Sequence, residues 1–172
     1  RRVLFRSVFV GSSSTAFVRH SNEPSTSGEG IDLSDISLTG AQEQLIRSVC
    51  ATGKPVVVVL VVGKPFAIPY IKEKVPAILA QWYAGEQAGN SIADILFGKV
   101  NPSGKLPFSF PQSTGHLPAY YNYLPTDKGY YKEPGTYTSP GRDYVFSSPA
   151  PLWTFGHGLS YTSYEYSNFK VN

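Results

Sequence analysis

A carboxylate stands at the centre of a small, polar, glycine-rich loop, Ser-Thr-Ser-Gly-Glu-Gly-Ile-Asp, over residues 25–32. Gly28 and Gly30 flank Glu29, and glycine adopts positive φ angles freely and lets the backbone come close to a ligand. Nothing in the loop would bury the Glu29 side chain in a core, so the sequence predicts a carboxylate presented to a binding site. The alternative is an acidic loop that is merely solvated beside the start of a helix.

Further polar side chains lie upstream, in a long connection after the apolar residues 8–11, which resemble the end of a buried strand. Loops that follow the carboxyl ends of strands hold the binding residues of open α/β sheets. Arg19, His20 and Glu23 are therefore candidates for the same site as Glu29. For Arg19 and His20, ordinary solvation is an equally good interpretation.

Composition and motifs exclude several other functions. A net charge of +3 and the lack of a basic helix argue against a nucleic-acid partner. Three scattered histidines and the single Cys50 give neither metal-ligand spacing nor an internal disulfide, so we expect no metal and no cofactor. No phosphate-binding glycine motif and no serine-hydrolase elbow occur. The longest apolar run, residues 56–62, is too short to span a membrane.

Apolar patterning predicts alternating strands and helices. A run of β-branched residues that is apolar on both faces belongs in the middle of a sheet covered by helices on both sides. We therefore expect an α/β fold, with a mostly parallel sheet and helices on both faces. The predicted strands cover residues 8–11, 56–62 and 77–82, the helices 39–53, 69–75 and 86–97, and an extended segment outside the sheet or at its edge 105–111.

Several residues within these elements have structural interpretations. Thr39 and Gln42 fit a capping box at the start of the first helix, and Cys50 falls on its apolar stripe. Trp82 ends a strand, and we expect it to pack in the core or at a domain interface. Asp94 should make a structural contact, and His157 lies between two glycines, which indicates a tight turn.

The two ends and one internal region differ from the rest. Residues 1–7 resemble a translated sequencing adapter, and we exclude them from the domain, which we assign to residues 8–163. Residues 112–151 are rich in Tyr, Gly and Pro and lack periodicity, as in a long functional or docking loop. Residues 164–172 alternate like the first strand of a further domain. These ends suggest a fragment of a longer chain.

Seven motifs together resemble the C-terminal α/β-sandwich domain of family 3 glycoside hydrolases, the β-glucosidase and β-xylosidase group. They occur in the family's order, with departures at Leu33 and Ala84, where the family often has Arg and Pro. The motifs are SGEGID (27–32), LTGAQEQLI (38–46), KPVVVVL (54–60), QWYAGEQAG (81–89), IADILFG (92–98), NPSGKLP (101–107) and FGHGLSY (155–161).

The resemblance implies a retaining exo-acting β-glycosidase in which this domain lends Glu29 as general acid/base, with Glu23 as the rival for that role. It implies a nucleophile on an absent (β/α)₈ barrel, a fibronectin III-like domain beginning at residues 164–172, and a periplasmic or secreted location. The substrate would be a β-linked glycoside, and the fragment alone would be inactive. Two alternatives are a non-catalytic carbohydrate-binding or docking domain and a stand-alone nucleotide binder.

Overall fold

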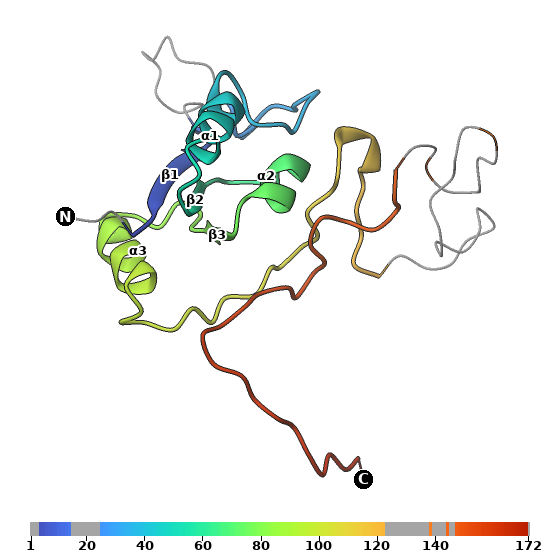
Figure 1. The fold of residues 1–172 in the computed structure, drawn as a ribbon. Helices are drawn as coiled ribbons and strands as arrows, with labels where there is room; N and C mark the ends of the chain where they lie inside the picture. The colour runs from blue at the N-terminus through green and yellow to red at the C-terminus, as the bar shows by residue number, and fades with distance from the viewer. Residues whose placement is uncertain (1–3, 15–24, 123–137, 139–143, 145–146, 172) are drawn as a thin grey trace.

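Three parallel strands in the order β1-β2-β3 form the centre of the fold: β1 (Arg6–Gly11), β2 (Val56–Val61) and β3 (Ala77–Ala80) (Figure 1). The computed structural model describes residues 4–14, 25–122, 138, 144 and 147–171. Arg6 pairs with Val56 at one end of the first strand pair, and β2 pairs with β3 from Val57 onward. The predicted parallel sheet is confirmed.

Strand β2 is the most deeply buried part of the sheet, as its β-branched sequence predicts. Val58, Val59 and Leu60 are at most 1% exposed, because β2 has a strand on each side and packing on both faces. The core cluster continues from this strand into Ile46 and Ile71 of the helices at residues 42–50 and 69–74, and into Phe110 and Leu152 further along the chain. Its fully buried large side chains include Phe66, Phe110, Ile46, Ile68 and Ile71.

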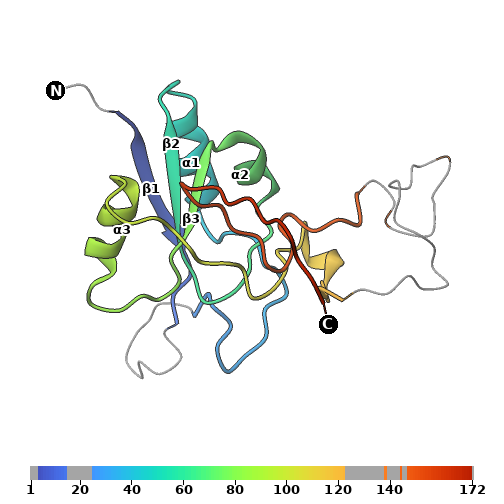
Figure 2. The same cartoon turned by 90° about the horizontal axis from the view of Figure 1, so that it is seen from below.

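The helices cover both faces of the sheet, which confirms the predicted α/β sandwich. Helices α1 (Gln42–Cys50) and α2 (Pro69–Lys74) lie on one face, and α3 (Ala88–Leu96) lies on the other (Figures 1 and 2). Right-handed crossovers between parallel strands place α1 and α2 on the same side. Pro69 occupies the first turn of α2, and Gly98 follows α3 with a φ of 75°.

The predicted capping box at α1 is wrong. The helix begins at Gln42, its preceding residue is Ala41, and no side chain caps the helix start. Gln42 does contact Thr39, but its amide is directed mainly to the backbone of Gly11 at the end of β1. Tertiary hydrogen bonds have thus replaced the local ones that the sequence pattern suggests.

Strand β3 ends two residues earlier than predicted, because Trp82 has a φ of 60° and turns the chain out of the sheet. The Trp82 ring packs edge-on against the Phe108 ring, with the ring centres 5.3 Å apart, and it also packs against the Phe110 ring. The expected packing role of Trp82 is therefore confirmed. Cys50 also packs against the core, as its place on the apolar stripe indicated.

The extended segment of residues 105–111 runs outside the parallel sheet, as predicted. It forms an antiparallel bridge between Phe110 and Trp153. The Phe110 N–H donates to the Trp153 carbonyl at 2.8 Å, and the Leu152 N–H donates to the Phe110 carbonyl at 2.7 Å. The His157 turn closes beside it: Gly156 has a φ of 79°, and a Cβ on Gly158 would lie 2.2 Å from the Gly104 carbonyl oxygen. The predicted tight turn with small neighbours is confirmed.

The described part of the Tyr, Gly and Pro-rich region contains a turn that the sequence does not reveal. A 3₁₀ turn over Thr114–His116 buries His116, whose ring hydrogen-bonds Ser113 at 2.8 Å and the Ser148 carbonyl at 3.0 Å. The ring also stacks on Tyr144 at 4.0 Å. Residues 164–171 form no strand in the described part of the chain, and no helix there is long and apolar enough to cross a membrane.

Candidate functional site

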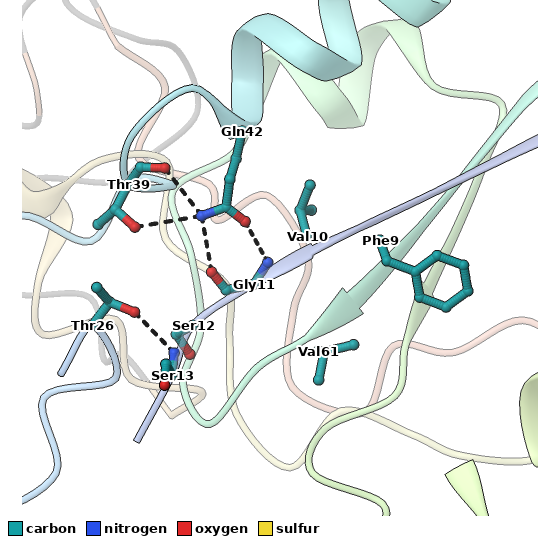
Figure 3. A pocket seen from close by; sticks show the side chains of 9 residues that line it. All are labelled: Phe9, Val10, Gly11, Ser12, Ser13, Thr26, Thr39, Gln42 and Val61. Carbon is teal, nitrogen blue, oxygen red and sulfur yellow. Dashed lines mark hydrogen bonds between the residues drawn. The ribbon is translucent and has the colours of Figure 1, made fainter. Parts of the chain in front are cut away.

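A shallow pocket of about 380 Å³ lies at the carboxyl ends of β1 and β2, beside the start of α1 (Figure 3). This edge of a parallel sheet is where α/β proteins place their ligands, because the loops that leave the strands converge there. The pocket is lined by Phe9, Val10, Gly11, Ser12, Ser13, Thr26, Thr39, Gln42 and Val61.

Gln42 lines this pocket and hydrogen-bonds the backbone of Gly11, another of its lining residues. Its Oε1 accepts a hydrogen bond from the Gly11 N–H at 2.6 Å, and its Nε2 donates to the Gly11 carbonyl at 3.0 Å (Figure 3). The same Nε2 donates to the Thr39 carbonyl at 3.0 Å. One side-chain amide therefore satisfies both backbone groups of the residue that ends β1.

The two loops above the pocket are tied together at Ser13. The Ser13 N–H donates to the Thr26 hydroxyl at 2.9 Å, and the Ser13 carbonyl accepts from the N–H groups of Thr26 and Ser27 at 2.9 Å and 3.1 Å. These three bonds attach the loop of residues 25–32 directly to the segment that leaves β1. The position of β1 therefore sets the position of that loop.

Glu29 is exposed at the tip of this loop, as predicted. Gly28 and Gly30 adopt φ angles of 80° and 75°, so both flanking residues use the conformation that glycine permits. The Ser14 hydroxyl donates to the Glu29 carboxylate, and the Ile31 N–H donates to the Gly28 carbonyl at 3.1 Å. The loop thus holds a carboxylate outside the core, near the edge of the sheet where β1 and β2 end.

The other sequence candidates, Arg19, His20 and Glu23, lie outside the described residues. Asp94, by contrast, makes the structural contact expected of it, an ion pair with Lys99 at 3.1 Å.

Tyr83, which follows β3, hydrogen-bonds the segment that follows β1. Its hydroxyl donates to the Ser12 carbonyl at 3.0 Å and also lies 3.0 Å from the Ser12 hydroxyl. The ring passes over Gly63, where a Cβ would lie 2.8 Å from the Tyr83 Cε2 atom. Loops from all three strands therefore meet around Ser12.

A buried cation follows β2. The Lys64 Nζ is buried, has no hydrogen-bond partner in the described part of the chain, and lies 4.7 Å from the centre of the Phe66 ring. Burial lowers the pKa of Lys64, and the negative charge of Asp35 opposes this only in part. The pKa of Asp35 is itself lowered, mainly by the Ser37 N–H at 2.8 Å.

Sequence reasoning predicted the exposed position of Glu29 but missed Gln42 as a pocket residue, together with Tyr83 and Lys64. Gln42 was visible only as a local cap, and Tyr83 only as the residue after Trp82. In the described residues, no group of three or more His, Cys, Asp or Glu side chains is placed to hold a metal ion. At this edge of the sheet the structure shows the exposed Glu29 carboxylate and the hydrogen bond that Ser14 donates to it.

Comparison with known proteins extends over nearly the whole chain. A family model described as the glycosyl hydrolase family 3 C-terminal domain matches residues 7–161. A periplasmic beta-glucosidase of Salmonella typhimurium is 45% identical over 145 residues, which are 84% of this chain and 19% of the relative. A beta-xylosidase of Formosa agariphila is 42% identical over 151 residues, which are 86% of this chain and 19% of the relative.

Solved structures agree with the sequence relatives. The crystal structure of a beta-glucosidase from Listeria innocua matches with a TM-score of 0.79 and 35% sequence identity, covering 94% of this chain and 21% of that protein. The chain therefore spans about a fifth of the length of the relatives that it matches.

Proposed function

Since the chain belongs to the glycosyl hydrolase family 3 C-terminal domain family, we propose that it is the part of a retaining, exo-acting β-glycosidase that supplies the general acid/base, Glu29. The proposed substrates are terminal β-linked sugars of the glucose or xylose type, in line with the names of its relatives. The observation that carries the proposal is the exposed carboxylate between two positive-φ glycines, at the carboxyl-end edge of the sheet.

Retaining hydrolysis needs two carboxyl groups about 5 Å apart across the glycosidic bond. One attacks the anomeric carbon, while the other protonates the leaving oxygen and later activates a water molecule. In the proposed arrangement Glu29 is the second group, and the first is carried by polypeptide outside this chain, on a (β/α)₈ barrel. A short, polar, glycine-flanked loop suits a carboxylate that must reach a sugar held by another domain.

The hydrogen bond from Ser14 suits this role, because a hydroxyl is a neutral donor that orients the carboxyl group without supplying a fixed positive charge. No salt bridge to Glu29 occurs among the described residues. A carboxylate held by a cation would resist the protonation that a general acid needs.

The test is leaving-group dependence in the full-length gene product. With Glu29→Ala, hydrolysis of alkyl glycosides should fall by roughly 10²–10⁴-fold, while dinitrophenyl glycosides, which need no acid, should still react in the glycosylation step. Azide should partly restore turnover by attacking the glycosyl-enzyme in place of activated water. Glu23→Ala is the matched control.

Full activity in Glu29→Ala, together with loss in Glu23→Ala, would move the assignment to Glu23. Full activity in both variants, with sugar binding retained, would favour a non-catalytic carbohydrate-binding domain. We also propose a periplasmic or secreted location, because the Salmonella relative is a periplasmic beta-glucosidase. Fractionation of the native cells tests this proposal.

A further inference from the structure

We infer that Gln42 is a positioning residue for Glu29: its side-chain amide fixes the end of β1 and, through it, the loop that presents the carboxylate. The inference rests on the proposed function of Glu29. It concerns a residue that does not touch the substrate and acts through the backbone of Gly11.

The first step is the geometry of the Gln42 amide. It accepts from the Gly11 N–H at 2.6 Å and donates to the Gly11 carbonyl at 3.0 Å, while the remaining Nε2 hydrogen reaches the Thr39 carbonyl at 3.0 Å. This arrangement needs one acceptor and two donors on a single planar group, which a carboxamide offers and a carboxylate does not. Figure 3 shows the amide placed between these two backbone segments.

The second step is that Gln42 itself is held rigidly. It is the first residue of α1, and Ile46, one turn later on the same helix, is fully buried in the core. Gly11 is held equally closely on its other side, since a Cβ there would lie 1.8 Å from the Val61 carbonyl oxygen. The end of β1 is therefore fixed between the Gln42 amide and strand β2.

The third step connects Gly11 to Glu29 over three residues of chain. Ser13 makes three hydrogen bonds to Thr26 and Ser27, and the next residue, Ser14, donates to the Glu29 carboxylate. A displacement of Gly11 would therefore be passed to both attachment points of the loop. An error of about 1 Å in the position of a catalytic group costs up to about 10²-fold in rate.

The experiment separates positioning from simple stabilisation in the full-length gene product. Gln42→Glu keeps the side-chain shape but replaces the donor with an oxygen that faces the Gly11 and Thr39 carbonyls. Gln44→Glu, on an exposed position of the same helix, is the matched control for the charge change. The readout is the ratio of kcat/KM for an alkyl glycoside to kcat/KM for the dinitrophenyl glycoside of the same sugar.

We expect this ratio to fall about tenfold or more in Gln42→Glu and to stay unchanged in Gln44→Glu, because only the alkyl substrate needs a well-placed acid. A merely structural role would lower the folded fraction and reduce both rates equally, so an unchanged ratio would overturn the inference. If Gln42→Glu does not accumulate in folded form, Gln42→Met, which is uncharged and of similar length, replaces it in the assay. A lower ratio in Gln42→Met would then support the inference, and an unchanged ratio would overturn it.

Glu29→Gln in the same assay keeps the two hypotheses apart. If the ratio of the two kcat/KM values falls in Glu29→Gln but stays unchanged in the Gln42 variant, only the positioning role of Gln42 is refuted. An unchanged ratio in Glu29→Gln refutes the proposed function, and the inference about Gln42 with it.

Discussion

Replacing Gly11 by alanine should destabilise the fold at the point where β1 meets β2. The new methyl group would lie 1.8 Å from the Val61 carbonyl oxygen and 2.6 Å from the Val61 carbonyl carbon. Ordinary contacts require about 3.5 Å, so the two backbones would have to separate by about 1.7 Å. The neighbour is backbone of the central strand and cannot move aside as a flexible side chain would.

The cost has two parts. Overpacking in a close-packed interior costs about 1–3 kcal/mol. If β1 moves away, the two hydrogen bonds between Gly11 and Gln42 are also lost, at about 1 kcal/mol each. When β1 moves away and both parts apply, we therefore expect a loss of about 3–5 kcal/mol in the free energy of unfolding.

Urea denaturation followed by tryptophan fluorescence measures this change, since Trp82 and Trp153 both pack against the core. The matched control is Gly89→Ala in α3, where a Cβ meets no atom within 4 Å. There the same substitution should stabilise by about 0.5–1 kcal/mol, because alanine is the better helix former. A Gly11→Ala midpoint equal to that of the parent chain would refute the steric reasoning.

Four further predictions follow from other contacts. Gly63→Ala should displace the Tyr83 ring from Ser12, so its destabilisation and that of Tyr83→Phe should be less than additive in a double-mutant cycle followed by urea denaturation. Phe110→Ala should cost about 3–5 kcal/mol in the same assay, because it empties a fully buried site between aromatic rings, whereas a shift below 1 kcal/mol would show that the site collapses. Lys64→Met should stabilise the chain most at neutral pH, and urea midpoints measured at a series of pH values should show this gain shrinking as the pH approaches 10.5. The reason is that burial lowers the pKa of Lys64 in the folded parent chain, so the unfolded parent chain binds more protons as the group titrates. The stability of the parent chain therefore rises with pH toward that of the variant. The purified 172-residue chain should release no product from an aryl β-glucoside, because the proposed nucleophile lies elsewhere, and turnover that survives Glu29→Ala would point to a different mechanism.

The sequence predicts much of the fold because the signals involved are local. The β-branched run of β2, Pro69 at the start of α2 and Gly98 after α3 each act through their own backbone or their immediate neighbours. Such preferences survive in the folded chain when the core agrees with them, as it does here.

The site was predictable only in part. The exposed position of Glu29 could be predicted because its two glycines are adjacent to it in the chain, while its role stays a prediction. Gln42 could not be assigned to the pocket, since its partner Gly11 is 31 residues away and the same residue types also fit a local cap. Tyr83 lies 71 residues from Ser12, a pairing that no local pattern encodes. The roles of Arg19, His20 and Glu23 stay predictions.

The hydrogen bonds between Ser13 and Thr26 also bear on how relatives of this domain could diverge. They close the base of the connection between these two residues, so the number of residues inserted between them need not change where Glu29 lies. Doubling the length of a closed loop costs only about 0.6 kcal/mol in chain entropy. Residues between Ser14 and Thr26 could therefore be added, removed or exchanged while the Glu29 carboxylate keeps its place, and a protein engineer could graft loops between these two points.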